Sequence, residues 1–164
     1  MNWAWQKDLS GIFYFCSISL KSNKMETTVK PITVETTVNA PIEKVWKFWT
    51  TPEHITKWCA ASDDWHTRYA ENDLRTGGKF KSRMEAKDGS AGFDWEGVYS
   101  NIEVNKLIAY EMGDGRRVKI VFSDLGGTTK VTETFDPENT NPIEMQRGGW
   151  QAILDNFRKY TETN

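Results

Sequence analysis

The sequence predicts an α+β domain in which a curved antiparallel sheet of about seven strands wraps around a long C-terminal helix, with two short helices between the first and second strands. Segments between residues 65 and 135 alternate apolar and polar side chains and are separated by short turns, as in strands that follow one another in hairpins. Residues 141–161 instead carry apolar side chains at helical spacing. Of the predicted elements, this helix alone is long enough to cover the apolar face of such a sheet.

The first predicted strand covers residues 33–38, which are rich in Val and Thr. It stops before Pro41, and proline is tolerated in the first turn of a helix. Pro52 favours a second short helix for the same reason. The apolar positions of the two helices are Ile42, Val45, Trp46 and Trp49, then Ile55, Trp58 and Cys59.

The remaining strands are predicted at residues 65–73, 79–87, 93–104, 107–112, 117–122 and 131–135. The clearest of them places Phe80, Ser82, Met84 and Ala86 on one face and mostly charged residues on the other. Such alternation predicts one dry face and one solvated face.

The sequence Asn141-Pro142-Ile143-Glu144 predicts the start of the long helix, with Asn141 as the capping residue. Its expected apolar stripe consists of Ile143, Trp150, Ile153, Leu154 and Phe157. Gly148 and Gly149 lie in mid-helix, where glycine is costly. They indicate either close packing of the helix on the sheet, which we favour slightly, or space beneath it.

The chain of 164 residues suits one domain, which we place at residues 25–164, with residues 1–24 as an N-terminal extension outside the fold. The apolar stretch at residues 12–20 is too short to span a membrane. A net charge of −2 does not favour nucleic acid. Cys16 and Cys59 form no disulfide framework, so we expect a reducing, cytoplasmic setting.

Several short sequences, in order along the chain, together carry a family resemblance. They are Ala40-Pro41 with Val45-Trp46, Trp49-Thr50-Thr51-Pro52-Glu53 with Lys57-Trp58, Gly77-Gly78-Lys79-Phe80, Met84 with Asp88-Gly89, Glu96-Gly97-Val98-Tyr99, Gly127-Thr128-Thr129-Lys130-Val131, and Gly149-Trp150. Residues 33–160 thereby resemble the SRPBCC superfamily, also called START-like or birch-pollen-allergen-like. Within it, the chain is most similar to the family homologous to the C-terminal domain of the activator of heat-shock protein 90 ATPase.

This resemblance implies a helix-grip fold with an internal cavity that holds a small hydrophobic molecule. It also implies two alternatives, a chaperone contact within the stress response and, as in a few members, catalysis on the bound molecule. The resemblance implies no cofactor, and the oligomeric state is left open, including a homodimer. We lean towards a binding protein rather than an enzyme.

The candidate ligand-binding residues are mainly inward-facing aromatic rings and thioethers, which suit apolar ligands. The full set is Trp49, Trp58, Trp65, His66, Met84, Trp95, Tyr99, Tyr110, Met112, Phe122, Glu133, Gln146 and Trp150. Taken singly, each ring fits a filled core better than a pocket. As a set, and with the resemblance, they predict a cavity.

Glu133 lies between Val131 and Phe135 on a face that we expect to be apolar. A buried carboxylate needs a partner or becomes protonated. It would orient a polar ligand group or act as a general acid or base, unless it pairs with Arg147 or Tyr110. Gln146, His66 and Tyr99 are the other candidates for orienting the ligand.

Other chemistries have little support. His66 with the neighbouring acids Asp63 and Asp64 lacks the paired spacing of a metal site, so we predict no metal. No nucleophile elbow, phosphate-binding loop or dinucleotide motif is present in the sequence. Cys59 is predicted to be a packed, inert thiol. The basic row in residues 79–87 is interrupted by Glu85 and predicts a solvated strand face.

Overall fold

The computed structural model describes residues 30–164, so the predicted extension at residues 1–24, with Cys16, lies outside the described residues. The elements follow the predicted order. They are β1 (Ile32–Val38), α1 (Ile42–Thr50), α2 (Pro52–Trp58), β2 (Trp65–Asn72), β3 (Lys79–Ala86), β4 (Gly92–Glu103), β5 (Leu107–Met112), β6 (Arg117–Asp124), β7 (Thr129–Phe135) and α3 (Ile143–Thr163).

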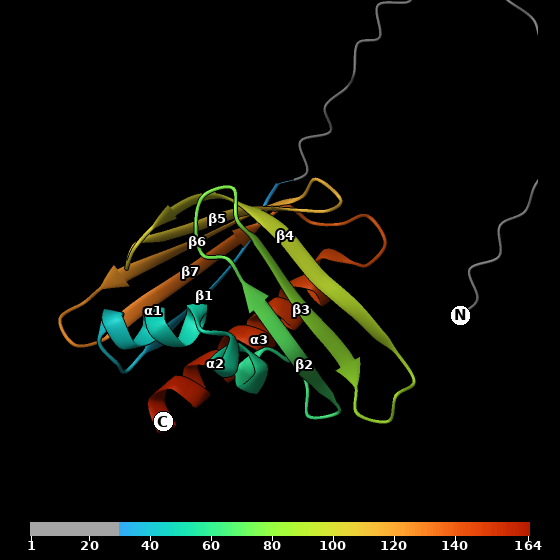
Figure 1. Ribbon diagram of the computed structural model, residues 1–164, viewed down its shortest axis with the longest axis horizontal. Helices are drawn as coiled ribbons and strands as arrows, with labels where there is room; N and C mark the ends of the chain where they lie inside the picture. The colour runs from blue at the N-terminus through green and yellow to red at the C-terminus, as the bar shows by residue number, and fades with distance from the viewer. Residues whose placement is uncertain (1–29) are drawn as a thin grey trace, which may run out of the picture.

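The strands form one antiparallel sheet in the order β1-β7-β6-β5-β4-β3-β2. Register shifts between Thr67 and Tyr69 in β2 and between Tyr99 and Asn101 in β4 interrupt the pairing. Such irregularities bend strands and increase their twist. The sheet curls around α3, and α1 and α2 lie at one end of it (Figure 1). This arrangement is the predicted helix-grip fold.

Both edges of the sheet are tied to helices. On α3, the side chains of Arg147 and Gln151 donate hydrogen bonds to the carbonyls of Thr33 and Glu35 on edge strand β1, at 3.1 and 3.2 Å. At the other edge, the amide of Asn72 on β2 donates to the carbonyl that ends α1. These bonds fix the helices against the sheet, and those on β1 occupy edge carbonyls that would otherwise be open to pairing.

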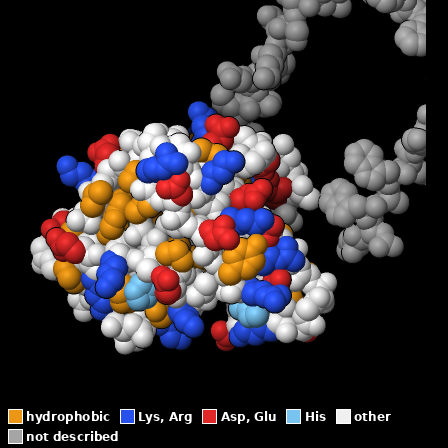
Figure 2. Space-filling view, viewed as in Figure 1, with side chains coloured by type: hydrophobic (Ala, Val, Ile, Leu, Met, Phe, Trp, Pro, Cys, Tyr) orange, Lys and Arg blue, Asp and Glu red, His pale blue; other side chains and the backbone are white. Residues whose placement is uncertain are grey.

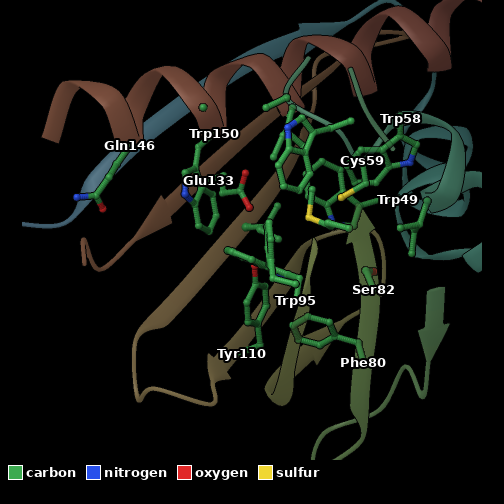
Figure 3. A pocket seen from close by; sticks show the side chains of 18 of the residues that line it. Trp49, Trp58, Cys59, Phe80, Ser82, Trp95, Tyr110, Glu133, Gln146 and Trp150 are labelled. Atoms are coloured by element: carbon green, nitrogen blue, oxygen red, sulfur yellow. The ribbon is translucent and has the colours of Figure 1, made fainter. Parts of the chain in front are cut away.

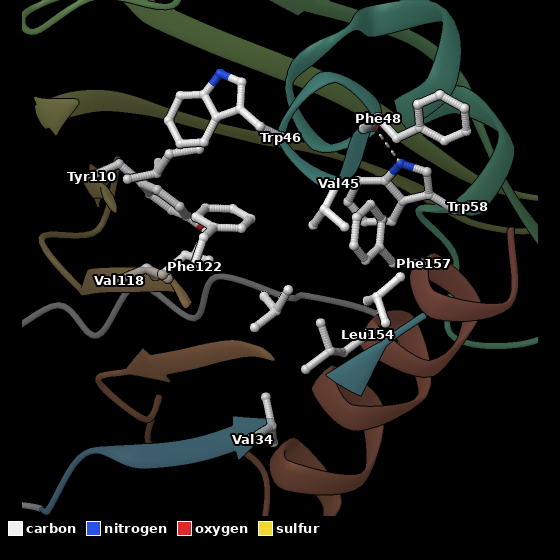
Figure 4. Packing of buried hydrophobic residues seen from close by; sticks show 14 of the residues in the cluster. Val34, Val45, Trp46, Phe48, Trp58, Tyr110, Val118, Phe122, Leu154 and Phe157 are labelled. Atoms are coloured by element: carbon white, nitrogen blue, oxygen red, sulfur yellow. Dashed lines mark hydrogen bonds between the residues drawn. The ribbon is translucent and has the colours of Figure 1, made fainter. Parts of the chain in front are cut away.

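The filled core lies where α1 and α2 meet the C-terminal half of α3 (Figure 4). Phe157 is fully buried, and the rings of Trp49 and Trp58 pack edge-on against it at centroid distances of 4.6 and 4.9 Å. The indole nitrogen of Trp58 donates to the carbonyl of Phe48 at 3.1 Å. The polar atom of this buried tryptophan is therefore satisfied within the core.

The start of α3 differs from the prediction in two ways. Pro142 precedes the helix, and Asn141 does not cap it, because its side chain and backbone amide both donate to the carboxylate of Glu138. Hydrogen bonds from the Thr140 and Asn141 backbone hold the pKa of Glu138 at about 2. Ile143, predicted in the apolar stripe, is exposed, and Gln146 is the buried side chain of the early helix, since the linker before α3 folds over it.

The two central members of the basic row predicted on β3, Lys81 and Arg83, are paired with acids on the outer face of the sheet. Lys81 contacts Asp94 at 2.7 Å, and Arg83 contacts Asp94 and Glu85 at 3.3 and 2.9 Å. The side-chain hydrogen bond from Lys81 lowers the pKa of Asp94. Charges of both signs are interspersed on the face drawn in Figure 2. This strand therefore presents no unopposed positive field.

Candidate functional site

A cavity of about 430 Å³ lies between α3 and the concave face of the sheet. Nine aromatic rings of the described chain line it, from both short helices, four strands and α3 (Figure 3). The rings are those of Trp49, Trp58, Trp65, Phe80, Phe93, Trp95, Tyr99, Tyr110 and Trp150. The size and the apolar wall match those of sites for small organic molecules.

Most of the predicted site residues line this cavity. They are Trp49, Trp58, Trp65, Met84, Trp95, Tyr99, Tyr110, Glu133, Gln146 and Trp150. The reason is the period of two in the strands, which places Trp95 and Tyr99, or Met84 and Ser82, on the same inner face.

His66, Met112 and Phe122 lie outside the cavity lining, which corrects their predicted placement. His66 follows the inward Trp65, so alternation turns it to the outer face, 3.7 Å from the carboxylate of Glu85. Met112 is buried at the end of β5, two residues beyond Tyr110. Phe122 belongs to the packed core, because the rings of Trp46 and Trp49 lie edge-on to it at centroid distances of 5.3 and 5.6 Å.

Some lining residues were missed by sequence reasoning. Phe80 and Ser82 share the predicted dry face with Met84, and Ile153 belongs to the predicted helix stripe, so the same patterns contained the signal. Gly97 permits the position of Phe80, since a side chain there would meet the Phe80 ring at 2.8 Å. Met145 also lines the cavity, although its side chain is largely exposed. No sequence pattern predicts this position, because it depends on how α3 lies over the sheet.

Glu133 is the only Asp or Glu among the described residues that line the cavity, and its side chain points into it (Figure 3). On β7 it faces Val34 of β1 and Ile120 of β6 across the sheet, neither of which is polar. Within residues 30–164, its carboxyl group receives no hydrogen bond and forms no ion pair. The pairing with Arg147 or Tyr110 considered from the sequence is absent there, and Arg147 bonds to β1 instead.

Burial raises the pKa of Glu133 to about 8, since the charged form loses its hydration without gaining a partner. At neutral pH the group is therefore mostly a neutral carboxylic acid. It is 6 % exposed and is also close enough to contribute to the raised pKa of the Tyr110 hydroxyl, of which burial is the main cause. The site thus holds one acid that a ligand could ionise.

The other polar candidates are engaged in holding the structure. Both ends of the Gln146 amide bond to the linker backbone, at the amide of Glu138 and the carbonyls of Glu138 and Asn141, at 2.7 to 3.0 Å. Figure 3 shows the amide directed away from Glu133. The Tyr99 hydroxyl donates to Asn72 at 2.8 Å, and burial raises its pKa. Gln146 and Tyr99 therefore contribute to the wall, with their polar atoms already paired.

Gly149 also lines the cavity, and this overturns the interpretation of close packing. A Cβ atom built at Gly149 would meet nothing within 4 Å, and the same holds for the exposed Gly148. Helix α3 is thus not pressed onto the sheet at this point. The missing side chain at Gly149 adds to the space beneath the helix.

Cys59 follows α2 and reaches the cavity wall. Burial raises the pKa of its thiol to about 11, so the thiolate is scarce at neutral pH. This agrees with the expectation of an unreactive thiol.

A second hollow, of about 360 Å³, shares Trp58, Cys59 and Trp65 with the first and has both polar and apolar lining residues. His66 lines it, together with the lysines at positions 57, 87 and 159. No three His, Cys, Asp or Glu side chains converge as metal ligands anywhere in residues 30–164. In the same range, no helix combines the length and hydropathy needed to cross a bilayer.

Comparison with known proteins gives relatives over most of the described chain. An AHSA1-like protein from Aeromonas hydrophila is 44% identical, with a TM-score of 0.77, over 82% of this chain and 93% of its own. A protein from Cytophaga hutchinsonii is 58% identical, with a TM-score of 0.71, over the same shares of the two chains.

A third structure, from Chromobacterium violaceum, is 20% identical with a TM-score of 0.74 over 82% of this chain and 99% of its own, which shows a shared fold. No curated protein matches the chain. The model of the family described as activator of Hsp90 ATPase homolog 1-like protein matches residues 39–162. The sheet curled around α3, the cavity beneath that helix and this match agree, and the chain belongs to the family of activator of Hsp90 ATPase homolog 1-like proteins, within the SRPBCC superfamily.

Proposed function

We propose that this protein binds a small, largely apolar molecule in the cavity between the sheet and α3. The observation that carries the proposal is a space of about 430 Å³ that is lined by nine aromatic residues and by the buried Glu133. An apolar molecule that leaves water for such walls gains about 25 cal/mol for each Å² buried. The wall supplies affinity and Glu133 supplies a single polar contact.

The experiment is a thermal-shift screen of lipids, polyketides and aromatic compounds, followed by calorimetric titration of those that raise the melting temperature. A ligand that binds only the folded state stabilises it according to its concentration and dissociation constant. Because several tryptophans line the cavity, bound ligands should also change the tryptophan emission.

The chain offers a matched pair of variants for this screen. Gly149→Leu places a side chain into the cavity, whereas Gly148→Leu adds the same side chain at an exposed position of the same helix. We expect the first variant to lose ligand binding and the second to keep it. If no compound shifts the melting temperature, or if both variants bind equally, the proposal is wrong.

A second candidate function follows from the family description, which names an activator of the Hsp90 ATPase. In that case the domain would contact a chaperone and raise its ATPase rate. The test is an ATPase assay with the Hsp90-type chaperone of the source organism, and the expected result is a rate that rises with the concentration of this protein. An unchanged rate would exclude this role.

A further inference from the structure

We propose that the ligand of this cavity is a hydrophobic amine, whose ammonium group pairs with the carboxylate of Glu133 while its apolar body lies against the rings around it. This inference rests on the proposed function and names the class of its ligand. It starts from the geometry of one inward-facing carboxyl group that has no partner within residues 30–164.

Within residues 30–164, the surroundings of Glu133 offer its carboxyl group no partner. Its neighbours across the sheet are Val34 and Ile120. The titratable groups near enough to interact with it are weak acids, namely Tyr110 on β5 and Cys59 after α2. Tyr99 on β4, another weak acid, lines the same cavity. Helix α3 contributes no charged side chain to the lining, and no Lys, Arg or His is part of it.

The basic residue nearest in α3, Arg147, is turned to the outside. Its guanidinium donates to the carbonyl of Thr33 and lies 3.5 Å from Glu144. The described part of the chain thus brings no positive charge to Glu133, and a cationic ligand would supply one. An anionic ligand would instead bury its charge in a space whose described lining holds no cation to offset it.

The rings beside Glu133 suit the same class of ligand. Trp150 is held rigidly, since it stacks on Phe135 at 3.8 Å between ring centroids and meets Trp95 edge-on at 5.1 Å. In Figure 3 the Trp150 indole and the Glu133 carboxyl group point into the same cavity, which Trp95 also lines. Tryptophan faces attract cations more strongly than other rings do, and most strongly where water is excluded. A carboxylate beside two indoles is thus complementary to an ammonium group on an apolar body.

The ionic state of Glu133 makes the proposal measurable. Its raised pKa of about 8 means that most molecules carry a proton on this group at about pH 7. An ammonium ion favours the carboxylate, so the amine displaces that proton into the buffer as it binds. A neutral ligand of the same shape leaves the proton in place.

The test is isothermal titration with three compounds that share one ring system: naphthylmethylamine, naphthalenemethanol and naphthoic acid. We expect the amine to bind at least about tenfold more tightly than the other two, which corresponds to about 1.4 kcal/mol. Titration in two buffers of different ionisation enthalpy should show proton release with the amine and none with the alcohol.

Two variants complete the test. Glu133→Gln keeps the size of the side chain and should bind the amine and the alcohol equally, without proton release. Gly149→Leu should weaken all three compounds together, because it fills the cavity. Melting curves of both variants establish that they are folded.

The outcomes separate this inference from the proposed function. If the alcohol or the acid binds wild-type protein as tightly as the amine does, or if Glu133→Gln keeps the preference, the cavity still binds ligands but the amine assignment is wrong. If none of the three compounds binds, the amine assignment is overturned. If, in addition, the broad screen finds no ligand, the proposed function fails with it.

Discussion

The two halves of α3 face the same sheet, yet one half is packed solid and the other covers a cavity. In the C-terminal half, Leu154, Phe157 and Thr161 are completely buried. In the N-terminal half, Gly149 and Trp150 border an open space. Side-chain size along the helix contributes to this difference, but the arrangement of the other helices explains more of it.

Helices α1 and α2 insert only beneath the C-terminal half of α3. The ring of His54 on α2 bonds to the hydroxyl of Tyr160 at 2.9 Å, and Asn156 donates to the carbonyl of Ala60. A third layer of side chains therefore fills that end, whereas at the other end Trp49 and Trp58 only border the space between the sheet and α3 and leave it open. The cavity therefore exists because no third layer of side chains fills this end, and aromatic residues line the space that remains.

The largest expected effect comes from truncating one aromatic residue in each half. Phe157→Ala should lower the free energy of unfolding by about 3–5 kcal/mol, because the surrounding rings cannot close the hole. Trp95→Ala, on the cavity wall, should cost only about 1–2 kcal/mol, since its ring already borders empty space. Urea denaturation measures both values. Equal costs would show that the two halves are packed alike.

The next effect depends on pH and concerns Glu133. The group keeps its proton in the folded state up to about pH 8, but in the unfolded state it ionises near its ordinary value of 4.5. Between these values the folded state holds the extra proton, so wild-type stability falls as pH rises, by about 1.4 kcal/mol per unit. Glu133→Gln should remove this slope, and its advantage over wild type should therefore grow from about pH 5 to about pH 8.

Denaturation at several pH values measures this difference. Glu138→Gln is the control, because Glu138 lies outside the cavity and its pKa is lowered rather than raised. For Glu138 the stability is present above the ordinary pKa and is lost as pH falls towards about 2, so this variant should not change the slope above about pH 5. A Glu133→Gln variant with the wild-type slope would show that Glu133 is ionised in the folded protein.

The smallest expected effect concerns the two adjacent glycines of α3, Gly148 and Gly149. Gly148→Ala and Gly149→Ala should each raise the free energy of unfolding by about 1 kcal/mol, because alanine is the better helix former and the added carbon meets no neighbour. Only Gly149→Ala should also weaken ligand binding, since only Gly149 lines the cavity. Thermal melting with and without a bound compound measures both effects. A loss of stability at Gly149 would indicate close packing after all.

Much of the cavity wall was predictable because strands have a simple period. The alternation in β4 and β5 places Trp95, Tyr99 and Tyr110 on the inner face without reference to any tertiary contact. The same rule also turns His66 outwards, next to the inward Trp65. The placement of Phe122 was not predictable in this way, because an inward side chain enters either the core or the cavity, and α1 decides which.

The order of the elements, the inner and outer faces of the strands and the presence of a carboxyl group on an apolar face all follow from the local sequence pattern, because they depend on periodicities of two and 3.6 residues. Three properties of the site depend on tertiary contacts. Glu133 has no partner in the described chain, the Gln146 amide forms hydrogen bonds with the linker backbone, and Gly149 faces the cavity. These properties depend on which elements far apart in the chain meet, and on where no element fills the space between them.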